Sequence, residues 1–318
     1  RPRPGQRRIQ GPGRLRQLLE RAAEFASGLG EACHLIRHCR LLLLHGALLA
    51  HLQERHGCTG YGVELDDANV LACVKRGVNV LQLNLDQGLR VFADQSLPGL
   101  AVGERHQIYE EMNHTISAIH RLDYVSLGLE TFGKPGNYFA RQIARWSRQV
   151  REANISIPDS LNKLMDWLPV HIPAEDETSL IHGDFRMDNL IFHKTDLRII
   201  GVLDWELSTL GNPLADFAYQ CMAWRIPPTL WRGIQGLNLV SLGIPSESEY
   251  IAKYEKQVER SISEHWPFLM AYNLFRISAI LHGITKRAMD GNANASDAIE
   301  NGAKAGALAD LGWACAQQ

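Results

Sequence analysis

Apolar and polar positions follow two different patterns along the chain, and the change falls near residue 97. Before it, residues 60–66 and 78–83 form short apolar runs typical of buried strands, with a helical pattern over residues 68–76 between them. Strands that alternate with helices are typical of a parallel α/β sheet. The pattern therefore predicts an α/β fragment over residues 46–96.

The chain after residues 97–100, Leu-Pro-Gly-Leu, has a different pattern. Residues 104–122 carry apolar side chains every three or four positions, which places them on one buried helix face. Further helices are expected over residues 137–152, 217–224, 247–260 and 266–289, and near residue 303. The pattern predicts a second, mainly helical α+β domain over residues 97–318.

Composition narrows the class of protein. Of 318 residues, 45% are hydrophobic and 21% are charged, as in ordinary folded proteins. With 33 basic and 35 acidic side chains the net charge is only −2, so no global field favours nucleic acid or an anionic membrane. No CxxC pair occurs, and no apolar run reaches the ~20 residues that span a bilayer. We expect reduced cysteines, no nucleic-acid or membrane partner, and a cytoplasmic location.

Residues 1–45 fit neither pattern. Residues 1–20 hold six arginines, but they lack the serine richness of a transit peptide and the apolar segment of a secretory signal. We leave residues 1–45 unassigned and expect them to be weakly ordered.

Polar residues gather between two apolar strands in residues 179–192, Ser-Leu-Ile-His-Gly-Asp-Phe-Arg-Met-Asp-Asn-Leu-Ile-Phe. They predict a tight loop at the edge of a core, where polar groups usually bind or catalyse. Another apolar strand, residues 199–203, leads to Asp204, which strand pairing would place beside this loop. Phosphoryl transfer needs positioning and cations, and Mg²⁺ prefers oxygen ligands. Asp184, Asn189 and Asp204 can supply those oxygens.

The run His182-Gly183-Asp184, with Asn189 and the later Asp204-Trp205-Glu206, resembles the signature of the aminoglycoside phosphotransferase and choline kinase superfamily. The resemblance implies the C-terminal lobe of a protein-kinase-like fold. It also implies that Asp184 is the catalytic base, and that Asn189 and Asp204 bind Mg²⁺ and through it ATP.

Further segments extend this resemblance over about residues 98–313, namely residues 137–143, 207–219 and 272–276. They are most similar to the branch related to the kinase domain attached to some acyl-CoA dehydrogenases. That branch implies a small-molecule hydroxyl acceptor, specifically a hydroxyacyl-CoA. Acceptor pockets vary freely on one fold, so the reaction class is implied more strongly than the substrate.

Residues near the motif have both a structural and a functional interpretation. His182 is expected to brace the loop rather than transfer protons, and Asp216 is expected either to cap a helix or to brace the loop from the core. Arg186 and Asp188 either remain solvated or contact substrate. Glu206 either touches a metal ion or bonds backbone amides, and the second interpretation is favoured.

The chain before residue 97 lacks the parts that a kinase normally places there. Lys75 is the sole lysine before Lys134, and it falls on the predicted helix over residues 68–76 rather than on a strand. No glycine-rich phosphate loop precedes it. The N-terminal lobe that binds the nucleotide phosphates in a kinase is therefore not recognisable in this segment.

Residues 46–53, 60–70 and 92–96, together with Asp86, instead resemble MetW-type methyltransferase-like proteins of methionine biosynthesis. That resemblance implies a partial Rossmann-like fold, in which Glu64 at the end of a strand bonds the ribose hydroxyls of S-adenosylmethionine. The glycine-rich turn that such a site needs is missing before Gly46.

Three hypotheses follow. The chain is an ATP-dependent phosphotransferase whose activity is in question because its N-terminal lobe is missing. Alternatively, it is a non-catalytic pseudokinase that holds a ligand. A third hypothesis is a chimeric chain that joins a MetW-like fragment to a phosphotransferase lobe.

Overall fold

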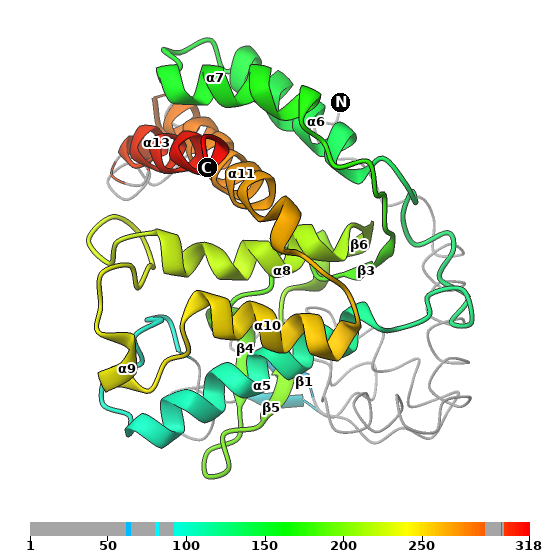
Figure 1. Ribbon diagram of the computed structural model, residues 1–318, viewed down its shortest axis with the longest axis vertical. Helices are drawn as coiled ribbons and strands as arrows, with labels where there is room; N and C mark the ends of the chain where they lie inside the picture. The colour runs from blue at the N-terminus through cyan, green and yellow to red at the C-terminus, as the bar shows by residue number, and fades with distance from the viewer. Residues whose placement is uncertain (1–61, 65–79, 83–91, 290–299, 301) are drawn as a thin grey trace.

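The computed structural model describes residues 62–64, 80–82, 92–289, 300 and 302–318, and the fold is presented for these residues (Figure 1). Residues 1–45 and the predicted helix over residues 68–76, with Lys75, lie outside the described residues, as does Asp86.

Helices dominate the described part of the chain, as the sequence predicts for residues 97–318. Their bounds are α5 (Val102–His120), α6 (Tyr138–Glu152), α7 (Asp159–Trp167), α8 (Pro213–Cys221), α9 (Leu239–Leu242), α10 (Glu247–Val258), α11 (Trp266–Met289) and α13 (Ala305–Ala316). Short 3₁₀ turns are η2 (Leu168–Val170), η3 (Met187–Asn189), η4 (Trp205–Leu207), η5 (Met222–Arg225) and η6 (Ser263–His265).

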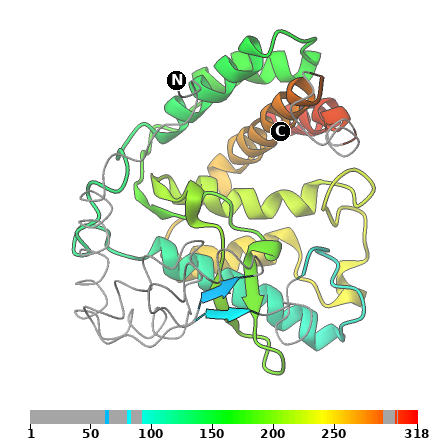
Figure 2. The same cartoon turned by 180° about the vertical axis from the view of Figure 1, so that it is seen from behind.

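Helix α11 is the central packing element. It contacts α6, α7, α8 and α13, while α5 and α10 pack against each other on the other side of α8 (Figures 1 and 2). Its length and composition would suit a membrane span, but 83% of its most apolar window is buried inside the lobe. Its aromatic residues are buried, and Tyr272 and Phe275 are completely buried. The helix is therefore the core of this lobe.

Two antiparallel strand pairs lie at the predicted polar loop. Strand β3 (Ser179–Ile181) pairs with β6 (Thr209–Gly211), and β4 (Leu190–Phe192) pairs with β5 (Ile199–Val202). Apart from the half-buried Ile200 and Thr209, these strands are built from buried residues. The pairs thus fix both ends of the loop against the core, with α5 and α8 in contact with β3.

The predicted Rossmann-like fragment over residues 46–96 is not supported. Within that range the structure describes β1 (Gly62–Glu64), β2 (Val80–Gln82) and residues 92–96. The two strands pair in parallel, as the sequence pattern predicts. A pair of three-residue strands is far less than a nucleotide-binding sheet, because such a sheet needs several parallel strands and their crossover helices.

Candidate active site

The polar loop begins where β3 ends, and its tight turn depends on Gly183. The backbone of Gly183 has φ +84°, a conformation that residues with a side chain rarely adopt. A Cβ at this position would lie 2.6 Å from the carbonyl oxygen of Leu207. The loop therefore packs directly on the backbone that follows β5, which brings the two halves of the predicted site together.

Pairing of β4 with β5 places Asp204 beside Asn189, as the sequence predicts. Leu190 faces Val202 in the register, and the Leu203 N–H donates to the Asn189 carbonyl at 2.7 Å. Asp204 then adopts a left-handed backbone conformation (φ 62°, ψ 54°) and begins η4. This conformation is uncommon for a residue other than glycine, and such residues gather at functional sites.

Asn189 is bonded to the predicted catalytic residue. Its Nδ2 donates to the Asp184 carbonyl at 2.8 Å and to Asp184 Oδ2 at 3.0 Å. Both partners can only accept, so the amide must present its nitrogen to Asp184. Its Oδ1 consequently faces away from Asp184 and is left for another partner.

The oxygen atoms of Asn189 and Asp204 fit a hard divalent cation. Within the described residues, no donor bonds Asn189 Oδ1 or the half-buried Asp204 carboxylate. Mg²⁺ is commonly held by one or two carboxylates together with substrate phosphates. Accordingly, no cluster of three His, Cys, Asp or Glu side chains suited to a metal is found in the described part of the chain.

Arg186 connects the Asp184 carboxylate to Asp188. Its Nε bonds Asp184 Oδ2 at 3.2 Å, and its NH1 bonds Asp188 Oδ2 at 3.2 Å. Asp188 also pairs with Arg232. The Arg186 side chain remains 27% exposed. Arg186 and Asp188 are thus neither freely solvated nor buried, and together with Arg232 they form a row of alternating charges.

Two residues from distant helices also reach the loop, and sequence reasoning missed them as site residues. Arg276, buried on α11, donates through NH2 to the Gly183 carbonyl at 2.6 Å. Its guanidinium carbon lies 4.9 Å from the ring centroid of Tyr219 on α8. Burial and the nearby Asp184 carboxylate raise the pKa of Tyr219, which therefore stays neutral. They end two of the segments that carry the family resemblance, residues 207–219 and 272–276, but nothing in those segments indicates a contact with the loop.

His182 braces the loop, as predicted. Its Nδ1 accepts from the Asp184 N–H at 3.2 Å, so its Nε2 carries the proton and donates to the Leu203 carbonyl at 2.8 Å. The ring is fully buried. Because both nitrogens are engaged, His182 links the loop to the end of β5 and has no nitrogen available for proton transfer.

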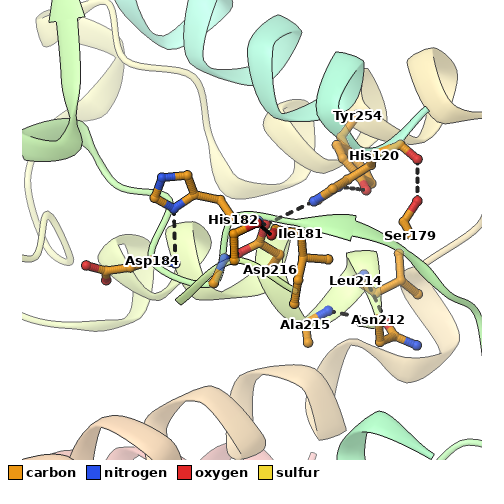
Figure 3. Close-up of polar contacts among 12 residues, drawn as sticks. His120, Ser179, Ile181, His182, Asp184, Asn212, Leu214, Ala215, Asp216 and Tyr254 are labelled. Atoms are coloured by element: carbon orange, nitrogen blue, oxygen red, sulfur yellow. Dashed lines mark hydrogen bonds and ion pairs between the residues drawn. The ribbon is translucent and has the colours of Figure 1, made fainter. Parts of the chain in front are cut away.

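Asp216 braces the loop from the core (Figure 3). Its carboxylate accepts the backbone N–H groups of His182 at 2.8 Å and Gly183 at 2.9 Å, and it also pairs with His120 at 3.1 Å. Burial tends to raise the pKa of Asp216, but the hydrogen bonds from the His120 ring and the His182 backbone hold it below its ordinary value. The alternative role as a helix cap belongs to Asn212, whose Oδ1 accepts the first N–H groups of α8.

The phosphotransferase enzyme family matches residues 63–239, which is more than half of the chain. The chain belongs to this family. The match includes the whole loop and the strands around it, and it begins within the range for which we predicted a methyltransferase-like fragment. It therefore assigns part of that range to the phosphotransferase family, and the resemblance to MetW-type proteins stays without support.

The chain is similar to a solved structure and to segments of longer proteins. A structure from Ralstonia eutropha JMP134, provisionally named an aminoglycoside phosphotransferase, is 50% identical with a TM-score of 0.70 over 72% of this chain and 70% of that chain. Acyl-CoA dehydrogenase family member 10 of Mus musculus is 41% identical over 70% of this chain. Family member 11 of Homo sapiens is 37% identical over 66% of it.

The two acyl-CoA dehydrogenase family members are much longer than this chain. The matched segments make up 21% of the mouse protein and 27% of the human protein. The similarity therefore concerns one part of those proteins. The protein-kinase-like lobe that the sequence implies is confirmed by the family match and by the solved structure.

Two predicted site residues cannot be placed. Glu64 ends β1, and Glu206 lies in η4, but the side chains of both lie outside what the structure describes. The predicted contact of Glu64 with S-adenosylmethionine stays a prediction without support. For Glu206, the choice between metal contact and backbone hydrogen bonding remains open.

Proposed function

We propose that this phosphotransferase moves the γ-phosphoryl group of ATP to a hydroxyl group of a small molecule. The observation that supports it best is the joint placement of three groups. Asp184 is bonded to Asn189, and the β4–β5 register sets Asp204 next to Asn189. This is the set of oxygen-bearing groups that phosphoryl transfer requires.

In this proposal Asp184 orients the acceptor hydroxyl and accepts its proton. The acceptor oxygen forms a bond to the γ-phosphorus while the bond from that phosphorus to the β–γ bridging oxygen breaks, and ADP leaves. Asn189 Oδ1 and the Asp204 carboxylate would hold Mg²⁺, which when bound neutralises charge on the phosphate oxygens. Arg186 holds the Asp184 carboxylate in place through the bond to Oδ2.

We further propose a hydroxyacyl-CoA as the acceptor. The support is the similarity to segments of proteins named as acyl-CoA dehydrogenase family members. The row of charges beside Asp184 is compatible with it, since Arg186 and Arg232 are partly exposed guanidinium groups that pair with Asp184 and Asp188. Guanidinium groups recognise phosphate oxygens well, and coenzyme A carries several.

The test is Mg²⁺-dependent ADP formation with a panel of hydroxyacyl-CoAs and of aminoglycosides. Asp184→Asn and Asp204→Asn should each abolish turnover, whereas Asp166→Asn is a matched control on the exposed face of α7. Wild-type protein without turnover on any acceptor would contradict the proposed function. ATP binding by calorimetry without turnover would favour the non-catalytic pseudokinase instead. Turnover of an aminoglycoside alone would contradict the acyl-CoA acceptor.

A further inference from the structure

A buried chain of polar side chains runs behind the catalytic loop, and its centre is His120 (Figure 3). His120 is the last residue of α5 and is 1% exposed. Its Nε2 lies 3.1 Å from Asp216 Oδ2, and its Nδ1 lies 2.6 Å from the hydroxyl of Tyr254 on α10. Its carbonyl accepts from Ser179 Oγ on β3 at 2.5 Å. One residue thus joins four elements of the lobe.

The direction of these hydrogen bonds follows from the carboxylate. Asp216 is ionised and can only accept, so the His120 Nε2 must carry a proton and donate it. In the neutral ring Nδ1 then accepts from the Tyr254 hydroxyl, whose pKa is raised well above its ordinary value by burial. The result is one directed series of donors, from Tyr254 through His120 to Asp216.

Asp216 receives donors from two sides. His120 and the backbone N–H of His182 share Oδ2, while the backbone N–H of Gly183 bonds Oδ1. The position of the carboxylate therefore sets the position of two consecutive loop amides. Asp184 follows directly in the chain, and its own N–H bonds the His182 ring.

We propose that His120 is a positioning residue for the catalytic loop and acts through the Asp216 carboxylate. Without the His120 donor the carboxylate keeps its two partners on the loop and none on α5, so the loop is held by α8 alone and the Asp216 side chain is no longer fixed from α5. The consequence for catalysis rests on the proposed function, because it assumes that Asp184 is the base. The consequence for loop position does not.

Two substitutions of His120 distinguish the contact of Nε2 with Asp216 from the contact of Nδ1 with Tyr254. His120→Gln places an amide nitrogen about where Nε2 lies and keeps a donor for Asp216. His120→Asn places its amide about where Nδ1 lies and keeps only the contact with Tyr254. Tyr254→Phe is the matched control, because it removes a buried hydroxyl of the same series while the donor to Asp216 stays.

Amide hydrogen exchange of peptides that cover residues 181–186 measures the loop in the substrate-free full chain. We expect exchange in His120→Asn to rise about tenfold, as for loss of one hydrogen bond to a charged group. His120→Gln and Tyr254→Phe should change it much less. Equal increases in all three variants, or none in His120→Asn, would overturn the proposal. Thermal unfolding of each variant shows that the folded state is being compared.

Kinetics give the second readout. With an acceptor that the wild type uses, His120→Asn should lower kcat about tenfold while KM for ATP stays nearly constant, and His120→Gln should restore most of kcat. A purely structural role would lower the stability of both variants alike without this difference in kcat, and would overturn the proposal. If the wild type turns nothing over while loop exchange responds as expected, the proposed function fails and the positioning role holds.

Discussion

The polar residues of the site fall into two groups, according to whether their side-chain atoms bond other parts of the protein. The side chains of the buried His182 and Asp216 form their hydrogen bonds with other groups of the protein. Asn189 Oδ1 and the Asp204 carboxylate have no donor within the described residues. Internal bonds thus fix the loop and leave the remaining oxygens for the ligand that we propose. This division is what a preorganised phosphoryl-transfer site requires.

The buried Asp216 should make stability depend on pH. In Asp216→Asn an amide N–H₂ would replace one of the two oxygens and face either the Gly183 N–H or the two donors that share Oδ2. The free energy of unfolding should therefore fall by about 3 to 5 kcal/mol near neutral pH. The pKa of Asp216 is below its ordinary value of 3.8. Its contribution is therefore present above that pH and lost as pH falls through the folded-state pKa. Urea unfolding at several pH values measures it.

The difference in stability between wild type and Asp216→Asn should accordingly narrow below pH 3.8. Asp196→Asn is a suitable control, because the pKa of Asp196 is lowered by its hydrogen bond with Arg198 on an exposed turn. Solvent screens such a pair, and its removal should change stability little. If the difference in free energy of unfolding between wild type and Asp216→Asn stays constant from neutral to acidic pH, Asp216 is not ionised in the folded state.

Gly183 is open to a test that separates steric conflict from backbone strain. Gly183→Ala should lower the free energy of unfolding by about 1–3 kcal/mol for the left-handed conformation alone. The contact with the Leu207 carbonyl should add to that cost and reduce turnover. Gly99→Ala is the control, since Gly99 has φ +81° but open space around it. Equal losses in chemical denaturation would refute the steric contribution.

The sequence predicts the residues of the loop but not those that hold it. Asp184, Asn189 and Asp204 are identifiable because polar residues interrupt apolar strands within a short stretch. His120 and Tyr254 lie on two different helices, with nothing local to distinguish them from other buried residues. Arg276 lies in the segment 272–276 that carries the family resemblance, but that segment does not indicate that its side chain bonds the loop. Their role depends on long-range packing, which a single sequence does not contain.

Among the elements, α8 connects the loop to the core, and its N-terminus is capped by Asn212. Asn212 Oδ1 accepts from Leu214 N at 2.9 Å and from Ala215 N at 3.4 Å. Asn212→Ala should cost about 1 kcal/mol, because it leaves buried N–H groups without a partner. Since Asp216 lies in the first turn of α8, loop exchange over residues 181–186 should also rise.

Asn238→Ala is the matched control for this prediction. Asn238 caps the four-residue helix α9 through Ser241, on an exposed part of the lobe. Asn238→Ala should lower the melting temperature less than Asn212→Ala does, and it should leave amide hydrogen exchange over residues 181–186 unchanged. If both variants behave alike, the position of α8 does not control the loop.

Element prediction succeeded where a pattern was long and failed where it was short. Helix α11 begins and ends at Trp266 and Met289 as predicted, since its buried face repeats over many turns. Strand β6 (Thr209–Gly211) was missed, because three residues carry too little pattern. Helix α7 (Asp159–Trp167) was also missed, although its apolar side chains pack against α11 and α13.

At the scale of the whole molecule, α6, α7, α8 and α13 of the described residues pack against α11. The family match extends upstream to residue 63, so the pattern change near residue 97 does not mark the start of the phosphotransferase family segment. Sequence pattern failed there because short alternating strands and helices occur in many α/β proteins. The predicted cytoplasmic location and the chimeric origin of the chain stay predictions.

Nucleotide binding offers a test of the whole lobe. A ligand that binds the folded state alone stabilises it, by about 2.7 kcal/mol at a concentration 100 times its Kd. If Asn189 and Asp204 hold Mg²⁺ for ATP, the melting temperature should rise with ATP and Mg²⁺ together, and a chelator should remove the shift. Asp204→Ala should lose it. Asp184→Asn should retain it, because Asp184 acts on the acceptor.

Asp166→Asn, on the exposed face of α7, should behave as wild type in the same melting experiment. An equal shift with and without Mg²⁺, or a full shift in Asp204→Ala, would contradict the proposed cation site. A shift that Asp184→Asn retains without any turnover by the wild type would instead identify a nucleotide-binding lobe that has lost its chemistry. Metal binding, nucleotide binding and phosphoryl transfer are thus tested separately on one folded unit.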